Sequence, residues 1–323
     1  MNKAIFDFLV AADPWVEYRT RLDILNEAPD SESVKKARSA MIAHPLVQGL
    51  IAEMRNWPGT VLSSHKSAGQ LYHKLVFLCD IGLTAKDEGL EQIAKKILGS
   101  ADENGIFRLC MNIPEHFGGS GLDEQAWALC DAPLLTYSLA KLGYVDDSRV
   151  KRAIESLMGL ARDNGFPCAV SKNLGKFRGP GKKDDPCPYA ALIMLKLLSL
   201  YEDKIKSREA ACSVETLLNL WDNSTTLHPY MFFMGTDFRK LKAPLIWYDI
   251  LNVADTLSHY DCAIADKRFK SMIDVVINKA NEAGLYTPES EWKAWKGWDF
   301  GQKKQPSAWL TFLVYRIWQR VHR

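Results

Sequence analysis

A helix-ending motif repeated at a regular interval limits the folds open to this sequence. Three amphipathic stretches close with an acidic residue, a glycine and an aromatic side chain, and the glycines are Gly105, Gly165 and Gly284. Glycine at such a position takes the left-handed conformation that ends a helix. Gly105 and Gly165 lie 60 residues apart, and Gly165 and Gly284 lie 119 apart, about twice that interval. Asn223 stands where the missing copy falls, so the pattern indicates repeated helix pairs.

A second, almost entirely apolar helix is the partner of each amphipathic one. These apolar helices are predicted to start near Ser67, Asp131, Asp185, Trp247 and Pro306. Neither member of such a pair buries its apolar surface alone, so the pairs must stack. Two further helices are expected over Trp15–Asn26 and Val34–Asn56. Because strand patterns are nearly absent, the prediction is an all-α chain of about twelve helices in inner and outer pairs.

The order of these features resembles one known superfamily. An apolar helix ends in Leu-Gly-Tyr at 142–144, Asp146 and Asp147 open an amphipathic helix, and Asn-Gly-Phe at 164–166 closes it. This pattern resembles the repeats of protein prenyltransferase β-subunits and terpenoid cyclases, over roughly residues 60–320. The resemblance implies a single α/α-toroid domain over residues 1–323, with residues 1–60 as amino-terminal helices that pack on the repeats. It also implies a cavity that takes an isoprenoid diphosphate.

The inner-helix amino termini of such a toroid open on one face, where their N–H groups favour anions. Basic and aromatic residues near these helix starts are therefore the candidate ligand-binding residues. The cations expected to hold an anionic group are Lys66, Arg178, Lys182, Lys183 and Lys304. The aromatic residues expected beside the ligand are Tyr189, Trp247, Tyr248, Trp298 and Trp309. This set predicts binding of a small amphipathic or phosphorylated ligand and leaves its turnover open.

Three aspartates, Asp131, Asp185 and Asp249, stand at equivalent places before or at the start of predicted inner helices. Carboxylates crowded around one cavity raise one another's pKa, and a carboxyl with a raised pKa serves as a general acid. They are accordingly the candidate catalytic residues. Aspartate is also a preferred helix cap, so three structural caps are an equally open interpretation.

The signatures that carry the best-known chemistries of the superfamily are missing here. The Asp-x-Asp-Asp acid of squalene–hopene cyclases, the Asp-Asp-x-x-Asp of ionising terpene synthases and the Asp-x-Cys of zinc prenyltransferases are all absent. No cofactor is therefore predicted, and whether the protein is an enzyme stays open. A zinc set of Cys130, Cys168, Cys187 and His65 is kept as an alternative, although no Cys-x-x-Cys pair supports it.

The amino-acid composition limits the classes of binding partner and the cellular compartment that we expect. Net charge is +2, from 41 Lys and Arg against 39 Asp and Glu, so nucleic acid is not favoured as a partner. The sequence has no apolar run of the length that spans a membrane. Seven scattered cysteines are expected as free thiols in a reducing compartment, which predicts a cytoplasmic protein. The oligomeric state is left open.

Two alternatives to the isoprenoid ligand come from other classes of protein. Toroids also serve polysaccharide hydrolases and lyases, which need a carboxylate pair across a groove, so a carbohydrate-active enzyme is the second hypothesis. A non-catalytic helical-repeat scaffold that binds a macromolecule is the third.

Overall fold

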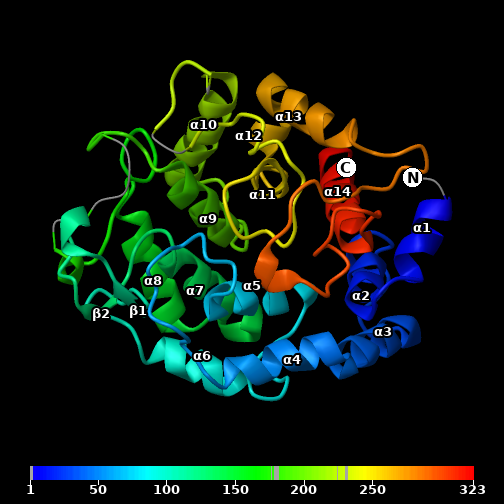
Figure 1. The fold of residues 1–323 in the computed structure, drawn as a ribbon, viewed down its shortest axis with the longest axis horizontal. Helices are drawn as coiled ribbons and strands as arrows, with labels where there is room; N and C mark the ends of the chain where they lie inside the picture. The colour runs from blue at the N-terminus through cyan, green and yellow to red at the C-terminus, as the bar shows by residue number, and fades with distance from the viewer. Residues whose placement is uncertain (1–2, 176, 178–181, 224, 230–231) are drawn as a thin grey trace. The chain divides into compact units, whose positions relative to one another are not determined.

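The computed structural model describes residues 3–175, 177, 182–223, 225–229 and 232–323, which fold into α-helices with one small sheet (Figure 1). Within these ranges the helices are α1 (Lys3–Val10), α2 (Pro14–Asp23), α3 (Glu32–Ala43), α4 (Pro45–Met54), α5 (Leu71–Ile81), α6 (Leu90–Leu98), α7 (Ala132–Leu139), α8 (Ser148–Met158), α9 (Pro188–Leu198), α10 (Arg208–Asn223), α11 (Ile250–Leu257), α12 (Asp261–Ala265), α13 (Lys267–Ile277) and α14 (Ala308–Val321). The strands are β1 (Leu109–Asn112) and β2 (Asp123–Ala126).

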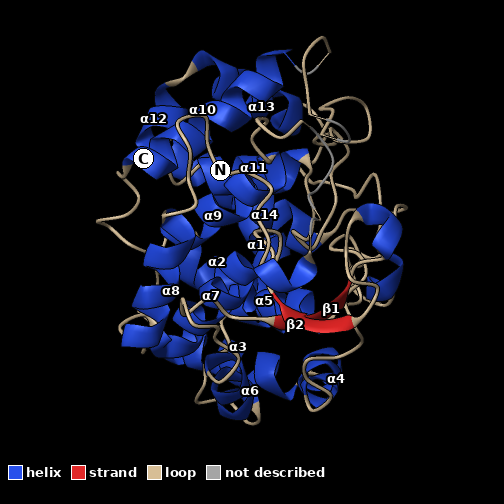
Figure 2. Cartoon of the chain, turned by 90° about the vertical axis from the view of Figure 1, so that its left-hand side faces the viewer, coloured by secondary structure: helices blue, strands red, loops and turns tan. Residues whose placement is uncertain are grey.

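The predicted fold class is wrong, because the chain is not purely helical. Strands β1 and β2 pair antiparallel, with Leu109 opposite Ala126 and Asn112 opposite Asp123 (Figure 2). The described residues contain fourteen α-helices rather than about twelve, and the structure does not show the toroid. The sequence did not predict the hairpin because each strand has only four residues, which is too few for a clear alternation of apolar and polar residues.

The chain divides into two compact units, Met1–Ala52 with Met234–Arg323, and Glu53–Phe233. In the second unit α5 packs on α7 and α7 packs on α9 (Figure 1). Every residue of α9 is buried, and α5 and α7 are buried almost throughout. These three helices form the core of that unit, as expected for segments that are apolar nearly all round.

In the first unit the amino-terminal helices pack against the carboxyl-terminal one, since α14 contacts both α1 and α2. Helix α11 also packs on α14. The core beside these helices contains aromatic rings: Trp298 lies 4.7 Å from Trp15 and 5.6 Å from Phe300, centroid to centroid. Burial of such large rings is a major source of core stability.

Two local predictions about helix ends differ from the structure. Gly105, Gly165 and Gly284 all have positive φ, but each lies in a turn seven residues after its helix ends at Leu98, Met158 or Ile277, so these glycines do not end the helices. The single helix predicted over Val34–Asn56 is two helices, because Pro45 begins α4 after α3 has ended at Ala43. None of the helices within the described ranges is long and apolar enough to cross a membrane.

Candidate functional site

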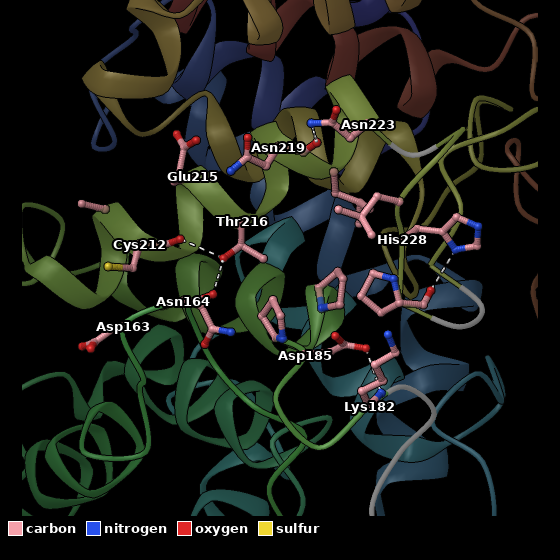
Figure 3. Close-up of a pocket in the computed structure, with 16 residues that line it drawn as sticks. Asp163, Asn164, Lys182, Asp185, Cys212, Glu215, Thr216, Asn219, Asn223 and His228 are labelled. Atoms are coloured by element: carbon pink, nitrogen blue, oxygen red, sulfur yellow. Dashed lines mark hydrogen bonds between the residues drawn. The ribbon is translucent and has the colours of Figure 1, made fainter.

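A cavity of about 880 Å³ opens in the second unit beside α10 (Figure 3). Its wall comes from four parts of the chain: the segments around residues 163–164 and 182–188, helix α10, and residues 227–229. The lining residues are Asp163, Asn164, Lys182, Asp185, Pro186, Pro188, Ala211, Cys212, Glu215, Thr216, Asn219, Leu220, Asn223, Leu227, His228 and Pro229. This volume lies in the range of small-molecule sites, about 300–1,000 Å³.

Helix α10 supplies the polar wall of the cavity. Cys212, Glu215, Asn219 and Asn223 follow one another at intervals of three or four, and Thr216 is adjacent to Glu215, so the five residues lie along one side of the helix. The helix buries a separate apolar stripe that includes Val214, Leu217 and Leu218. One helix therefore anchors itself in the core and presents carboxylate, hydroxyl and amide groups to the cavity.

The facing segment is held to α10 by hydrogen bonds. Thr216 Oγ1 lies 3.0 Å from the carbonyl oxygen of Asn164 and 2.9 Å from that of Cys212, and its single proton is shared between these two acceptors (Figure 3). Asn164 Nδ2 donates to the Asp184 carbonyl at 2.8 Å. A Cβ atom added to Gly165 would lie 2.5 Å from Thr216 Oγ1, so this close approach requires glycine.

The electrostatics of the lining disfavour an anion. Asp163, Asp185 and Glu215 are acidic, and among the described lining residues Lys182 is the basic partner. Asp163 already pairs with Arg208, and Asp185 accepts a hydrogen bond from the Lys182 backbone at 2.8 Å. Carboxylates and amides in one wall are suited to accept and donate hydrogen bonds to hydroxyl or amino groups.

A second polar cluster lies where α5, α7 and α9 begin, in the same unit. His65 Nε2 lies 2.7 Å from Oδ2 of Asp131, a carboxylate with no solvent exposure. The His65 carbonyl accepts hydrogen bonds from Tyr72 and from His73, which fixes the loop that carries the imidazole. Burial raises the pKa of Asp131, although the His65 hydrogen bond opposes this shift. The pair has the form of an oriented acid–base group.

The cysteines named in the zinc alternative are brought near this pair, but the geometry does not support a metal. Cys130 directly precedes Asp131, and the neighbouring Cys187 side chain, burial and the charge of Cys168 raise the pKa of the Cys130 thiol. No group of three or more His, Cys, Asp or Glu side chains suited to a metal ion occurs in the part of the chain that the structure describes.

The sequence-based site residues divide between the two units. In the second unit Lys182 and Asp185 line the cavity, Tyr189 is fully buried at the start of α9, and Lys66 and Lys183 are exposed. Arg178 lies outside the described residues. Three predicted residues of this unit, Asp131, His65 and Tyr189, thus belong to the buried cluster rather than to the cavity.

In the first unit the predicted residues take structural positions. Trp298 and Trp309 are buried in aromatic contacts, and Tyr248 packs on Phe238. Trp247 is half-buried and its carbonyl accepts from Asn252, while Lys304 is exposed. Asp249 is a buried helix cap whose side chain accepts from the Asn252 N–H at 3.0 Å.

Most residues of the cavity wall were not predicted from the sequence as candidate site residues. The stripe that carries Glu215, Thr216, Asn219 and Asn223 lies on an amphipathic helix, where polar residues usually face solvent. One available signal was its composition, since amide and hydroxyl side chains replace the Lys and Glu typical of a solvated face.

Comparison with known proteins does not indicate a function for this chain. No protein-family model matches the sequence, and no curated protein matches it. A solved structure of a protein from Actinoplanes aligns with 96% of this chain and 90% of its own, at 11% sequence identity and a TM-score of 0.43.

Proposed function

We propose that the cavity beside α10 binds a neutral or amino-bearing oligosaccharide. One observation carries the proposal: its wall combines three carboxylates and three amides with proline and leucine side chains in a volume of about 880 Å³. The polar groups suit sugar hydroxyl or amino groups, and the apolar ones suit the C–H faces of the rings.

The isoprenoid diphosphate expected from the family resemblance stays a prediction, but this lining argues for a different ligand. A diphosphate carries several negative charges, which the three wall carboxylates would repel and which Lys182 alone, among the described lining residues, would attract. The cytoplasmic location predicted from sequence remains part of the proposal, supported by seven cysteines that are free thiols.

Titration calorimetry with chitotriose, chitosan trimer, cellotriose and geranyl diphosphate tests the ligand class. We expect one or more of the saccharides to bind, and Glu215→Gln and Asn219→Ala to weaken that binding about tenfold each, as loss of a hydrogen bond to a ligand does. Asp222→Asn is the matched control, because Asp222 is an exposed residue of α10 that does not line the cavity. Binding of geranyl diphosphate alone, unchanged by Glu215→Gln, would contradict the proposal.

A further inference from the structure

The cavity beside α10 directs many of its hydrogen-bond donors at the protein rather than at a ligand. Asn164 Nδ2 donates to the Asp184 carbonyl at 2.8 Å, and Asn223 Nδ2 donates to the Asn219 carbonyl at 3.1 Å (Figure 3). The Thr216 hydroxyl lies within 3.0 Å of two backbone carbonyl oxygens, so its proton is also used within the protein. Each of the two amides then offers a ligand its oxygen and one remaining N–H.

His228 adds an acceptor to the wall. Its Nδ1 atom lies 3.0 Å from the Pro229 carbonyl oxygen, and a carbonyl oxygen only accepts, so Nδ1 carries the proton (Figure 3). The Nε2 atom of the neutral ring therefore has a lone pair and accepts hydrogen bonds. His228 is exposed and lines the cavity, so this lone pair is within reach of a ligand.

The charges of the wall add to this excess of acceptors. Asp163, Asp185 and Glu215 supply three carboxylates, against the Lys182 ammonium among the described lining residues. Arg208 pairs with Asp163 from outside the lining, but both side chains are largely exposed, and water weakens such a pair. Asp185 accepts a hydrogen bond from the Lys182 backbone N–H, a neutral group that leaves the carboxylate its charge. The wall is therefore rich in acceptors and negative in formal charge.

We propose that the ligand of this cavity carries free, protonated amino groups, which makes it a deacetylated amino-sugar oligomer rather than a neutral or an N-acetylated one. This rests on the proposed function of the cavity as an oligosaccharide site. A protonated amine has three donors, no acceptor and a positive charge, and it therefore matches both the acceptors and the charge of the wall. A hydroxyl both donates and accepts, and an acetamido group adds a carbonyl that needs a donor. Either group in place of the ammonium supplies fewer donors and loses the charge attraction.

Titration calorimetry at pH 6 with chitosan trimer, N-acetylated chitotriose, cellotriose and spermidine tests the requirement for an amine. A sugar amine is mostly protonated at this pH, since a comparable α-amino group has a pKa of about 7.7–8.0. We expect the chitosan trimer to bind about tenfold or more tightly than chitotriose, from which it differs by the acetyl groups, and than cellotriose. Raising the salt concentration from about 0.05 to about 0.5 M should weaken the chitosan trimer several-fold and leave cellotriose unchanged.

A charge-removing variant of the wall gives a second readout. Lys182→Gln should tighten binding of the chitosan trimer about threefold to tenfold, because it removes a repelling cation while the backbone N–H that bonds to Asp185 remains. Lys183→Gln is the matched control, because Lys183 is exposed and is not among the described lining residues. Weaker or unchanged binding of the trimer to Lys182→Gln would contradict the proposed charge match.

The probes separate failure of this inference from failure of the proposed function. Equal binding of the chitosan trimer, chitotriose and cellotriose would support an oligosaccharide site and overturn the requirement for an amine. Spermidine that binds as tightly as the chitosan trimer, with no binding of the other two saccharides, would support the requirement for an amine and overturn the oligosaccharide site. If none of the four probes binds, both proposals are wrong.

Discussion

Asp249 shows how burial alone prepares a carboxyl group for acid chemistry. Its side chain is 3% exposed; Oδ1 accepts from the Asn252 N–H, and Oδ2 has no hydrogen-bond partner among the residues described. Burial raises its pKa to about 7, against the opposing effects of that hydrogen bond and of Lys242. A carboxyl that is half-protonated near neutral pH can act as a general acid. The same side chain caps α11, so Asp249 has the features of both interpretations made from the sequence, a candidate general acid and a helix cap.

The raised pKa of Asp249 predicts a pH dependence of stability. In the unfolded chain its carboxyl loses a proton near the ordinary value of 3.8, whereas the folded chain keeps the proton up to about pH 7. The wild-type protein therefore loses stability as pH rises from about 4 to 7 and loses no more from this group above that window. Asp249→Asn, whose amide oxygen still accepts from Asn252, should flatten this decline by a few kcal/mol. Urea unfolding of both proteins at pH 4, 5.5 and 7 measures this change in the free energy of unfolding.

Asp266→Asn is the matched control, because Asp266 caps α13 in the same unit with the opposite shift. The hydrogen bond from Arg268 lowers the pKa of Asp266 to about 2. Its contribution to stability is present above about pH 4 and is lost as pH falls toward 2, outside the window of Asp249. If the free energies of unfolding of the wild type and Asp249→Asn change in parallel between pH 4 and 7, the pKa of Asp249 is not raised and the prediction is wrong.

Among the helices, those buried on all sides were the ones most readily predicted. Helices α5, α7 and α9 begin at Leu71, Ala132 and Pro188, within a few residues of their predicted starts at 67, 131 and 185. Their apolar sequences encode burial directly. The β1–β2 hairpin was not predictable in this way because its strands have only four residues each, and the wall of the cavity was not because it joins segments far apart in the sequence.

An ion pair within this apolar core ties the three helices together. Lys196 of α9 lies 2.8 Å from Oδ2 of Asp80 on α5, and the Tyr137 hydroxyl of α7 donates to Oδ1. Burial alone would raise the pKa of Asp80, but the Lys196 ammonium and the bonds from Lys196 and Tyr137 hold it below its usual value. Paired charges are tolerated inside a protein, and a single remaining one is not.

Removing one partner of this pair should cost more than replacing both. Asp80→Ala leaves the Lys196 ammonium buried without its carboxylate and should lower the free energy of unfolding by about 3–5 kcal/mol. The double variant Asp80→Leu with Lys196→Met replaces both charges by apolar groups and should recover most of that loss. Denaturant unfolding at pH 7 measures both. A single variant within 1 kcal/mol of the wild type would mean that the pair is solvated in solution.

The division into units has a consequence that a repeat pattern could not reveal. The interval between the repeated glycines indicates a succession of helices along the chain, but it does not say which helices share a core. Here the first 52 residues join the last 90, from Met234 to Arg323. In that unit Asp255 of α11 pairs with Arg316 of α14 at 2.8 Å and with Arg320 at 2.9 Å. Two guanidinium groups therefore share one carboxylate.

Asp255→Ala should accordingly loosen this unit as a whole. Because the two arginines are left without their carboxylate, we expect a loss of about 3–5 kcal/mol, and amide hydrogen exchange in α11 and α14 faster by about a hundredfold or more. Amides of α1 and α2 should speed up with them, although they lie more than two hundred residues away in the sequence, since both helices pack on α14. Amides of α5, α7 and α9 should keep their rates. Asp274→Ala, an exposed aspartate of α13, is the control. Unchanged exchange in α1 and α2 would show that the two ends of the chain do not form one cooperative unit.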